Sequence, residues 1–429
     1  MTAPIVADSK PLPGTLRPLS PMERLFDAIY DTNGFNFAIA VSFSGKIERP
    51  RWAAAFAQLQ QRHPFLNAHI NHEDEHAPFL HRAENPPIPL TFEVKTSPTQ
   101  WERVIEAHIE EPFGAAPLVR ATLLEDEAGC DLVFTAHHAI LDGVGAVALL
   151  RDLMAALAGD AMEAMPVPPS AEERLRTMRL SVLPQPPADP QAAEARNQFL
   201  ASLPVRAFQP YTGTRRPTVS SIGITPEETR QWLACARSHN VTLGAVLIAA
   251  MAAAVRQLTP SLKTSDIRIA VPVNNRPHLN NQDDAVLCIS IAHIVCVDPD
   301  QGLWGTARAV LEQLRQAQGL DAAEQYLEAI KPIMDAKLGA ATLVRLLATN
   351  NGTDATLTNL KQVDFLRLPD GLSVQAVWGP AVCAPIAPTF VIGAATFNGA
   401  LRLVYTTHMP LPGMLETLRT IVSRACADA

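Results

Sequence analysis

Apolar and polar residues alternate along residues 35–44, where bulky side chains are separated by small or polar ones. The apolar positions are Phe35, Phe37, Ile39, Val41 and Phe43. A period of two predicts a β-strand, and we expect one buried face. Helical spacing of apolar residues predicts helices over residues 52–62 and 147–157. The first is ended by Arg62-His63-Pro64 and the second by Gly159.

Two short segments carry the signature of a helix start. Ser20-Pro21-Met22-Glu23 and Thr225-Pro226-Glu227-Glu228 each place a hydroxyl before a proline and a glutamate at the third helical position. The hydroxyl and the glutamate satisfy backbone amides that have no partner within the helix. Because each segment lies near the start of one half of the chain, the recurrence indicates two related lobes.

The second half reads as strands with a closing helix. Strand patterns occur at IRIAVPV, LCISIAHIVCV, ATLTNL, LSVQAVW and PTFVIGAATFNGALRLVYTT, and Asn398-Gly399 in the last of these predicts a hairpin. A helix is expected over residues 412–422. We expect an α/β fold with mixed sheets and two lobes, because 429 residues exceed what one core usually supports. The expected domains are residues 1–170, a proline-rich crossover linker over 171–217, and residues 218–429.

Composition narrows the function classes. A net charge of -8 provides no basic surface for nucleic acid. The six cysteines form no C-x-x-C pair, and H-E-x-x-H is absent, so we expect buried thiols and no metal. The longest apolar run has 13 residues, and no secretory leader is visible, so we expect a cytoplasmic protein without a membrane span.

The segment AHHAILDGVGA, residues 136–146, is the strongest candidate for chemistry. Strand alternation places His137 and His138 on opposite faces, so the two imidazoles cannot share a role. A neutral imidazole is suited to remove a proton near pH 7, and His138 is the candidate base. Asp142 either orients that imidazole or pairs with an arginine. Gly143 allows close backbone approach, and amides at the following helix start can face developing negative charge.

Plainer interpretations stand beside this one. Paired histidines at a strand end are often ordinary core residues, and H-x-x-x-D spacing is common by chance. A serine hydrolase is disfavoured because the chain contains no G-x-S-x-G segment.

The segment His137-His138-Ala139-Ile140-Leu141-Asp142-Gly143 resembles the HHxxxDG signature of an acyltransferase superfamily. That superfamily includes chloramphenicol acetyltransferase, nonribosomal peptide condensation domains and polyketide-associated acyltransferases such as phthiocerol dimycocerosyl transferase, and the last group is the most similar. Further matching segments, in the same order, are LRPLSPMERLF, QRHPFLNAHI, EPFGAAPLVRATLL, VPVNNRP and LTNL. Lys361 departs from the pattern, because relatives often carry glycine there.

The resemblance implies two chloramphenicol acetyltransferase-like lobes, with the motif at their interface beside a solvent channel. It implies that His138 is the base and that His137 and Gly143 are its structural neighbours. It further implies that Asp142 forms a buried ion pair, with Arg276 or alternatively Arg62. Two other residues implied near the channel are Asn275 and Asn359.

The implied function is transfer of an acyl group from a thioester to an alcohol or amine, giving an ester or amide. Acyl-coenzyme A or an acyl carrier protein would be the donor, with coenzyme A or phosphopantetheine as the thioester carrier and no permanently bound cofactor. We expect a monomer, since two lobes complete one active site. The alternatives are a stand-alone condensation-type synthase, a non-catalytic carrier-protein docking module, and an epimerase that exchanges an α-proton.

Overall fold

The structure is a computed structural model that describes residues 14–74, 77–84, 86–181, 198, 207–281 and 284–428. Much of the linker expected over residues 171–217 therefore lies outside the described residues. The described start of that linker is helical, as α5 (Ala171–Ser181). Ser170 precedes this helix and exchanges hydrogen bonds with Glu173, whose backbone N–H donates to the Ser170 hydroxyl.

The first half of the chain alternates strands and helices. In chain order it contains β1 (Thr15–Pro18), α1 (Pro21–Asn33), β2 (Asn36–Ser44), α2 (Arg49–Arg62), the 3-10 helix η1 (Pro64–Asn67), β3 (Ala68–Asn71), β4 (Phe79–Arg82), β5 (Leu90–Val94), α3 (Gln100–Glu110), β6 (Val119–Glu125), β7 (Gly129–His137), α4 (Gly143–Leu157) and α5. The helices predicted over residues 52–62 and 147–157 are α2 and α4, and both predictions are confirmed.

The second half begins after the linker. Its elements are β8 (Gln209–Pro210), β9 (Thr218–Ile224), α7 (Pro226–Ser238), α8 (Leu243–Leu258), η2 (Pro260–Leu262), β10 (Ile267–Asn274), β11 (Ile289–Cys296), η3 (Pro299–Gln301), α9 (Gly302–Gln316), α10 (Leu320–Asp335), α11 (Ala340–Asn351), β12 (Ala355–Gln362), β13 (Ser373–Val382), β14 (Ile386–Ala387), β15 (Phe390–Phe397), β16 (Ala400–Thr407) and α12 (Met414–Ala427).

Local sequence signals account for several element boundaries. Ser20 and Thr225 each accept from the third helical amide, and the glutamate at that position accepts from the capping residue's own amide. The two predicted helix starts are therefore confirmed as those of α1 and α7. Asn398 and Gly399 connect β15 to β16 with φ angles of 46° and 76°. Two consecutive positive φ angles are what a two-residue hairpin turn requires, so this prediction is confirmed too.

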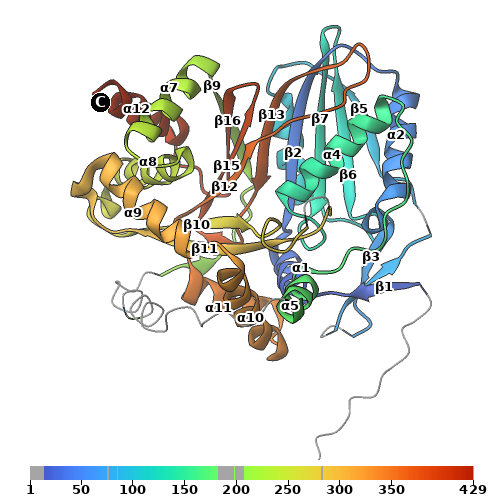
Figure 1. Ribbon diagram of the computed structural model, residues 1–429, viewed down its shortest axis with the longest axis horizontal. Coiled ribbons are helices and arrows are strands. Elements are labelled where there is room, and N and C mark those ends of the chain that lie inside the picture. Colours follow the sequence, from blue (N-terminus) through green and yellow to red (C-terminus); the bar gives the residue numbers. More distant parts are fainter. Residues whose placement is uncertain are drawn as a thin grey trace, which may run out of the picture.

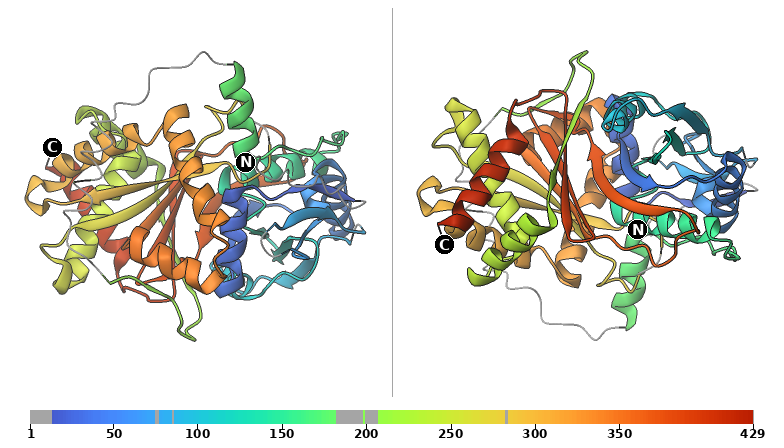
Figure 2. Two further views of the ribbon diagram at one scale, coloured as in Figure 1. Left: turned by 90° about the horizontal axis from the view of Figure 1, so that it is seen from below. Right: turned by 90° about the horizontal axis from the view of Figure 1, so that it is seen from above.

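Two mixed sheets form the two lobes, as Figure 1 shows. The first sheet has the strand order β13-β2-β7-β6-β5, and the second has β11-β10-β12-β15-β16-β9. The α/β fold with mixed sheets is confirmed. Strand β13 comes from the second half of the chain but pairs antiparallel with β2, so the second half completes the sheet of the first lobe. Figure 2 shows the two lobes from two further directions.

Strand β2 was expected to have one buried face, and this prediction is wrong. Ala38 and Ala40, on the face opposite the bulky residues, are fully buried. They belong to a cluster that includes Trp101 and Ile105 of α3. Alanine side chains are short, so helix α3 can lie close to the strand and cover this second face.

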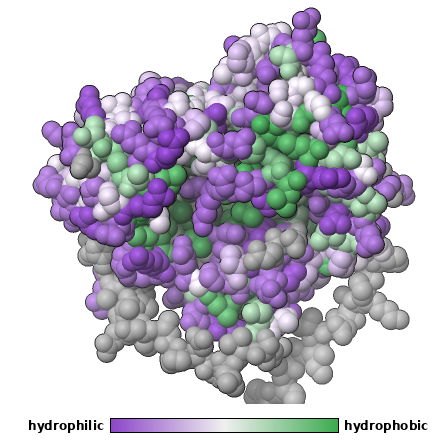
Figure 3. Space-filling model, turned by 45° about the horizontal axis from the view of Figure 1, so that its top comes forward, coloured by the Kyte–Doolittle hydropathy of each residue, from purple (hydrophilic) through white to green (hydrophobic). Residues whose placement is uncertain are grey.

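Most of the surface in Figure 3 is polar, with apolar residues gathered in separate patches. Among the described residues, no single helix is both long enough and apolar enough to cross a membrane. Helices α7 and α8 reach that length and hydropathy only together, and the chain bends by 97° between them. Helix α8 is almost entirely buried in the core of the second lobe.

Pro380 of β13 lies between two glycines where the lobes meet. A Cβ on Gly393 of β15 would lie 1.9 Å from the Pro380 carbonyl oxygen, and one on Gly143 of α4 would lie 2.7 Å from the Pro380 Cγ. Both distances are shorter than the contacts that Cβ atoms make in proteins. The backbone of β15 and the start of α4 can therefore approach β13 only because these two residues lack side chains.

We predict that Gly393→Ala destabilises the protein by about 1–3 kcal/mol or more, because the new methyl group meets backbone that has no room to move. Gly114→Ala is the matched control, since a Cβ there meets nothing within 4 Å. Urea unfolding of both variants measures the difference. Equal unfolding midpoints for the two variants would contradict the close approach of β15 to β13.

Candidate active site

The candidate site forms where β7 ends and α4 begins, in the middle of the first sheet. His137 is the last residue of β7, residues 138–141 form a turn, and Asp142 precedes α4. The His138 backbone N–H still donates to the Phe35 carbonyl oxygen, at 3.2 Å, in the chain segment that enters β2. The turn over residues 138–141, called the motif turn below, is therefore anchored to the sheet.

The His138 ring is held by a hydrogen bond within the motif turn. Its Nδ1 lies 2.9 Å from the Leu141 carbonyl oxygen. A carbonyl oxygen can only accept, so Nδ1 must carry the proton. In a neutral imidazole the other nitrogen, Nε2, then has a free lone pair. The geometry assigns to His138 the tautomer that a general base needs.

Three phenylalanines surround the His138 ring. The ring centroids of Phe26, Phe35 and Phe37 lie 4.8, 5.0 and 4.7 Å from that of His138. Burial among these rings lowers the pKa of His138 to about 4, although the Asp142 charge and the hydrogen bond to Leu141 oppose the shift. His138 is therefore neutral at pH 7. The residue is only half-buried, so part of it still reaches solvent.

His137 has the opposite arrangement. Its Nδ1 accepts from the Ala139 backbone N–H at 3.2 Å, so its proton must be on Nε2. The ring lies against Tyr30, with centroids 4.0 Å apart, and the residue is fully buried. Burial lowers the pKa of His137 to about 4, opposed by the charge of Asp27. Adjacent histidines thus adopt opposite tautomers, and only His138 has an unoccupied lone pair.

Asp142 uses both carboxylate oxygens for other contacts. Oδ1 accepts from the Gly145 N–H at 2.8 Å, which caps α4. Oδ2 accepts from Arg276 Nη1 and from the Cys288 N–H, each at 2.8 Å. Asp142 and Arg276 are each 2% exposed, so this is a buried ion pair that joins the two halves of the chain. The carboxylate acts on His138 by its charge and makes no hydrogen bond to the ring.

Arg276 is the partner of Asp142, and Arg62 is not. Arg276 also donates through Nη2 to the Val286 carbonyl oxygen at 2.7 Å. Arg62 instead donates to Asp152 at 2.7 Å. Gly145 makes room for the arginine, because a Cβ there would lie 3.0 Å from Arg276 Nη2.

Gly143 is the first residue of α4, and its backbone faces the second half of the chain. A Cβ at this position would meet Pro380, and it would also lie 3.1 Å from Leu360 Cδ2. The first-turn amides of a helix lack partners within the helix and carry its positive dipole end. Of these, Gly145 N–H is already taken by Asp142. The amides of Gly143 and Val144 are the candidates for holding an anionic oxygen.

The two asparagines expected near a channel lie in different surroundings. Asn275 is 1% exposed, and its side-chain oxygen accepts from Ser290 at 3.3 Å. Asn359 is half-buried, and its side-chain oxygen accepts from the Lys361 N–H at 2.8 Å. Lys361 adopts a φ of 60°, in the left-handed region that favours glycine. Contact of either asparagine with a substrate stays a prediction.

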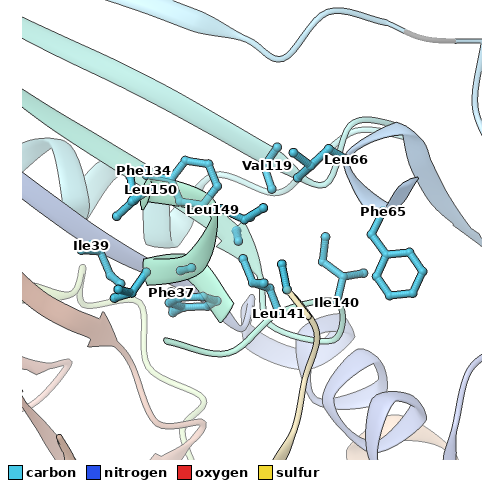
Figure 4. Packing of buried hydrophobic residues seen from close by; sticks show 14 of the residues in the cluster. Phe37, Ile39, Phe65, Leu66, Val119, Phe134, Ile140, Leu141, Leu149 and Leu150 are labelled. Carbon is cyan, nitrogen blue, oxygen red and sulfur yellow. The ribbon is translucent and has the colours of Figure 1, made fainter. Parts of the chain in front are cut away.

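Two small cavities lie behind the motif turn. They share His63, Phe65 and Ala285 in their linings, and His138 lines neither. Each has room for about one water molecule. Figure 4 shows that Phe65 and Leu66 lie opposite Ile140 and Leu141 in this region. Within the described ranges no three His, Cys, Asp or Glu residues are placed to hold a metal ion.

Sequence reasoning missed the residues that tune the two histidines. Phe35 and Phe37 were identified only as strand positions, and Phe26 was not singled out. The pattern of alternating phenylalanines was visible in the sequence. The antiparallel pairing of β2 with β7, which places these phenylalanines beside the end of β7, was not. No local pattern pointed to Asp27 or to the Leu141 carbonyl.

Comparison with known proteins identifies the family. A sequence model of the condensation domain matches residues 16–317 of this chain. The chain belongs to the condensation-domain family. A curated relative, tyrocidine synthase 3 of Brevibacillus parabrevis, is 32% identical over 130 residues, which cover 29% of this chain and 2% of that protein. The match thus covers only a small part of that relative.

Solved structures share the fold of this condensation-family chain over nearly its full length. Polyketide synthase associated protein 5 from Mycobacterium tuberculosis has a TM-score of 0.69 at 19% identity, covering 97% of this chain and 99% of that one. A trichothecene 15-O-acetyltransferase from Fusarium sporotrichioides has a TM-score of 0.71 at 12% identity, covering 99% of both chains. The family and fold support a transferase of the acyl-transfer or amide-bond-forming kind.

We predict that Arg276→Ala lowers the stability of this condensation-family protein by about 3–5 kcal/mol, because it leaves the Asp142 carboxylate buried without its counter-ion. Arg367→Ala is the control. Arg367 pairs with Asp160 at 3.2 Å on the surface, where such pairs contribute about 0–1 kcal/mol. Chemical unfolding measures both variants, and a loss for Arg276→Ala no larger than the control's would disprove the buried role.

We further predict that stability falls as the pH is lowered from about 6.5 towards 4. Burial lowers the pKa of His108 and of His137 to about 4, from an ordinary value of 6.5. Between these values the unfolded chain binds protons that the folded chain does not, which favours unfolding by about 1.4 kcal/mol per pH unit and histidine.

The matched variant is His108→Gln, which removes one titrating ring that contacts Thr135 and Thr122 in the core. Unfolding midpoints measured from pH 7 to pH 4.5 should show about one proton fewer taken up on unfolding than in the wild type. An unchanged proton count would show that His108 is already protonated in the folded protein.

Proposed function

We propose that this protein transfers an acyl group from a thioester to an alcohol or amine, with His138 as the general base. The donor would be acyl-coenzyme A or an acyl group on the phosphopantetheine arm of a carrier protein. The observation that carries the proposal is the hydrogen bond from His138 Nδ1 to the Leu141 carbonyl oxygen, because it leaves Nε2 as the proton acceptor. Condensation-family membership supports the same kind of chemistry.

The proposed reaction balances with the two substrates and one imidazole. Nε2 of His138 takes the proton of the acceptor O–H or N–H as that oxygen or nitrogen attacks the thioester carbonyl carbon. A new C–O or C–N bond forms, and the carbonyl electrons move to its oxygen. When the carbonyl reforms, the C–S bond breaks and the sulfur takes the proton from Nε2. The neutral imidazole is then restored.

Two charges develop during these steps, and the fold supplies a partner for each. The oxyanion would be met by the Gly143 and Val144 amides at the start of α4, where the helix dipole is positive. The imidazolium would be stabilised by the Asp142 charge and by the Leu141 carbonyl oxygen, which both oppose the lowering of the His138 pKa. One chain holds all these groups, so we propose that a monomer suffices.

The proposal accounts for why the base is only half-buried. A ring enclosed completely among Phe26, Phe35 and Phe37 would be neutral but out of reach of both substrates. We propose that both substrates approach from the side on which His138 is exposed. Desolvation then has a single role, which is to keep the imidazole unprotonated at neutral pH.

We predict that His138→Ala lowers turnover by about 10²–10⁴-fold, because the acceptor loses its general base. The purified chain is incubated with a panel of acyl-coenzyme A and carrier-bound acyl thioesters, together with simple alcohols and amines, and products are scored by mass spectrometry. The control is His239→Ala, because His239 stacks on Trp304 in the second lobe, away from the motif turn.

The outcomes are distinct. Loss of transfer in His138→Ala, with an unchanged melting temperature and normal transfer in His239→Ala, supports the base assignment. Transfer that persists near the wild-type rate without His138 would remove it. A wild-type chain that binds a loaded carrier protein but consumes no thioester would indicate a docking module, and deuterium uptake at an α-carbon would indicate an epimerase.

A further inference from the structure

A buried carboxylate lies close to His137, the residue before the motif turn. Asp27 of α1 is 4% exposed. Its Oδ2 is 2.7 Å from His72 Nε2, and its Oδ1 is 3.8 Å from His137 Nε2. His72 follows β3 and is partly open to solvent, with a side chain 43% exposed. Asp27 thus connects a surface histidine with the buried histidine of the motif.

The contact with His137 involves the nitrogen that carries the proton. Nδ1 of His137 accepts from the Ala139 N–H, so the remaining ring proton is on Nε2, the atom that faces Asp27. At 3.8 Å the interaction is electrostatic and too long for a hydrogen bond. In a buried site a carboxylate at this distance still strongly favours an N–H over a lone pair.

The His137 ring is hydrogen-bonded to the backbone of the motif turn. Ala139, whose N–H the ring accepts, is the residue directly after His138. The Ile140 N–H donates to the His137 carbonyl oxygen at 3.3 Å. The turn continues to Leu141, whose carbonyl oxygen holds His138 Nδ1. If His137 changed tautomer, its Nδ1 would present a proton to the Ala139 N–H, and the turn would have to move.

Other charged groups near this histidine have separate partners or lie further out. The Tyr30 hydroxyl accepts from the Phe113 N–H at 2.6 Å. Asp31, one turn after Asp27, is exposed, and it acts on His72 and Asp27 by charge alone. Arg120 lies over the Phe113 ring and pairs with Glu111. The carboxylate that opposes the lowering of the His137 pKa is Asp27.

We propose that Asp27 is a positioning residue that fixes the tautomer of His137, and through it the motif turn that aims His138 Nε2 at the acceptor. The inference rests on the proposed function of His138, but its first link, from Asp27 to the His137 tautomer, is independent of any reaction. His72 completes the arrangement, because its bond to the second oxygen holds the carboxylate in place.

The first test measures tautomers directly. In protein labelled with ¹⁵N-histidine, long-range ¹H–¹⁵N correlation spectra distinguish Nε2–H from Nδ1–H rings, and His137→Gln identifies the His137 signals by their loss. In the wild type we expect an Nε2–H form for His137 and an Nδ1–H form for His138. An Nδ1–H form for His137 in the wild type would overturn the proposal without any variant of Asp27.

The second test compares two carboxylates on one helix face. Asp27→Asn is expected to mix the tautomers of His137 and to lower kcat about tenfold, or about 1.4 kcal/mol, with KM within about twofold. Asp31→Asn, the matched control, should leave the tautomers and kcat as they are. Equal behaviour of both variants in the spectra and in kcat would overturn the proposal.

The two measurements separate the possible failures. If the wild type transfers no acyl group, the function proposed for His138 fails, while the tautomer spectra still decide the role of Asp27. If Asp27→Asn does not fold, His72→Gln takes its place: loss of the bond that holds the carboxylate should mix the His137 tautomers, and unmixed tautomers would overturn the proposal. A kcat loss with unchanged tautomers would show that Asp27 acts by another route and would overturn the positioning role.

Discussion

The site depends on the buried ion pair between Asp142 and Arg276. The carboxylate of Asp142 is its central group. It accepts from the Gly145 amide in the first turn of α4, from the guanidinium of Arg276 and from the backbone N–H of Cys288. The first contact is local, whereas the other two come from the second half of the chain. One side chain therefore sets both the start of α4 and the position of the second lobe against it. Both of its oxygens are occupied, so its effect on His138 is that of a fixed charge.

Adjacent histidines acquire different chemistry because a strand end places them in different surroundings. His137 enters a buried site beside Tyr30 and gives its Nδ1 lone pair to a backbone amide. His138 lies among phenylalanines and gives its Nδ1 proton to a backbone carbonyl. Burial lowers the pKa of both rings to about 4, so both are neutral at pH 7. What distinguishes them is the tautomer. Each ring makes a hydrogen bond with the backbone of the same turn, and His137 also has the Asp27 carboxylate 3.8 Å from its Nε2.

The contact between the two lobes depends on residues without side chains as well as on the Asp142–Arg276 ion pair. Gly143 and Gly393 allow α4 and β15 to reach Pro380 from either side, and Gly145 allows Arg276 to reach Asp142. Strand β13, which carries Pro380, pairs with β2 in the first sheet. The start of α4, five residues after His138, thus lies where elements from both halves of the chain are in van der Waals contact. The side chains around His138 come from the first half of the chain, and the second half contributes the partners of Asp142.

The sequence by itself determined the features that depend on neighbouring residues. The capping boxes at Ser20 and Thr225, the Asn398-Gly399 hairpin and the order of the motif could all be predicted, because their hydrogen bonds close within a few residues. The tertiary structure decided the rest: the choice of Arg276 over Arg62, the pairing of β13 with β2, the burial of both faces of β2, and the phenylalanine rings that surround His138. Each of these is settled by groups far apart in the chain, and a local pattern contains no information about which distant groups the folded backbone brings within a few ångströms.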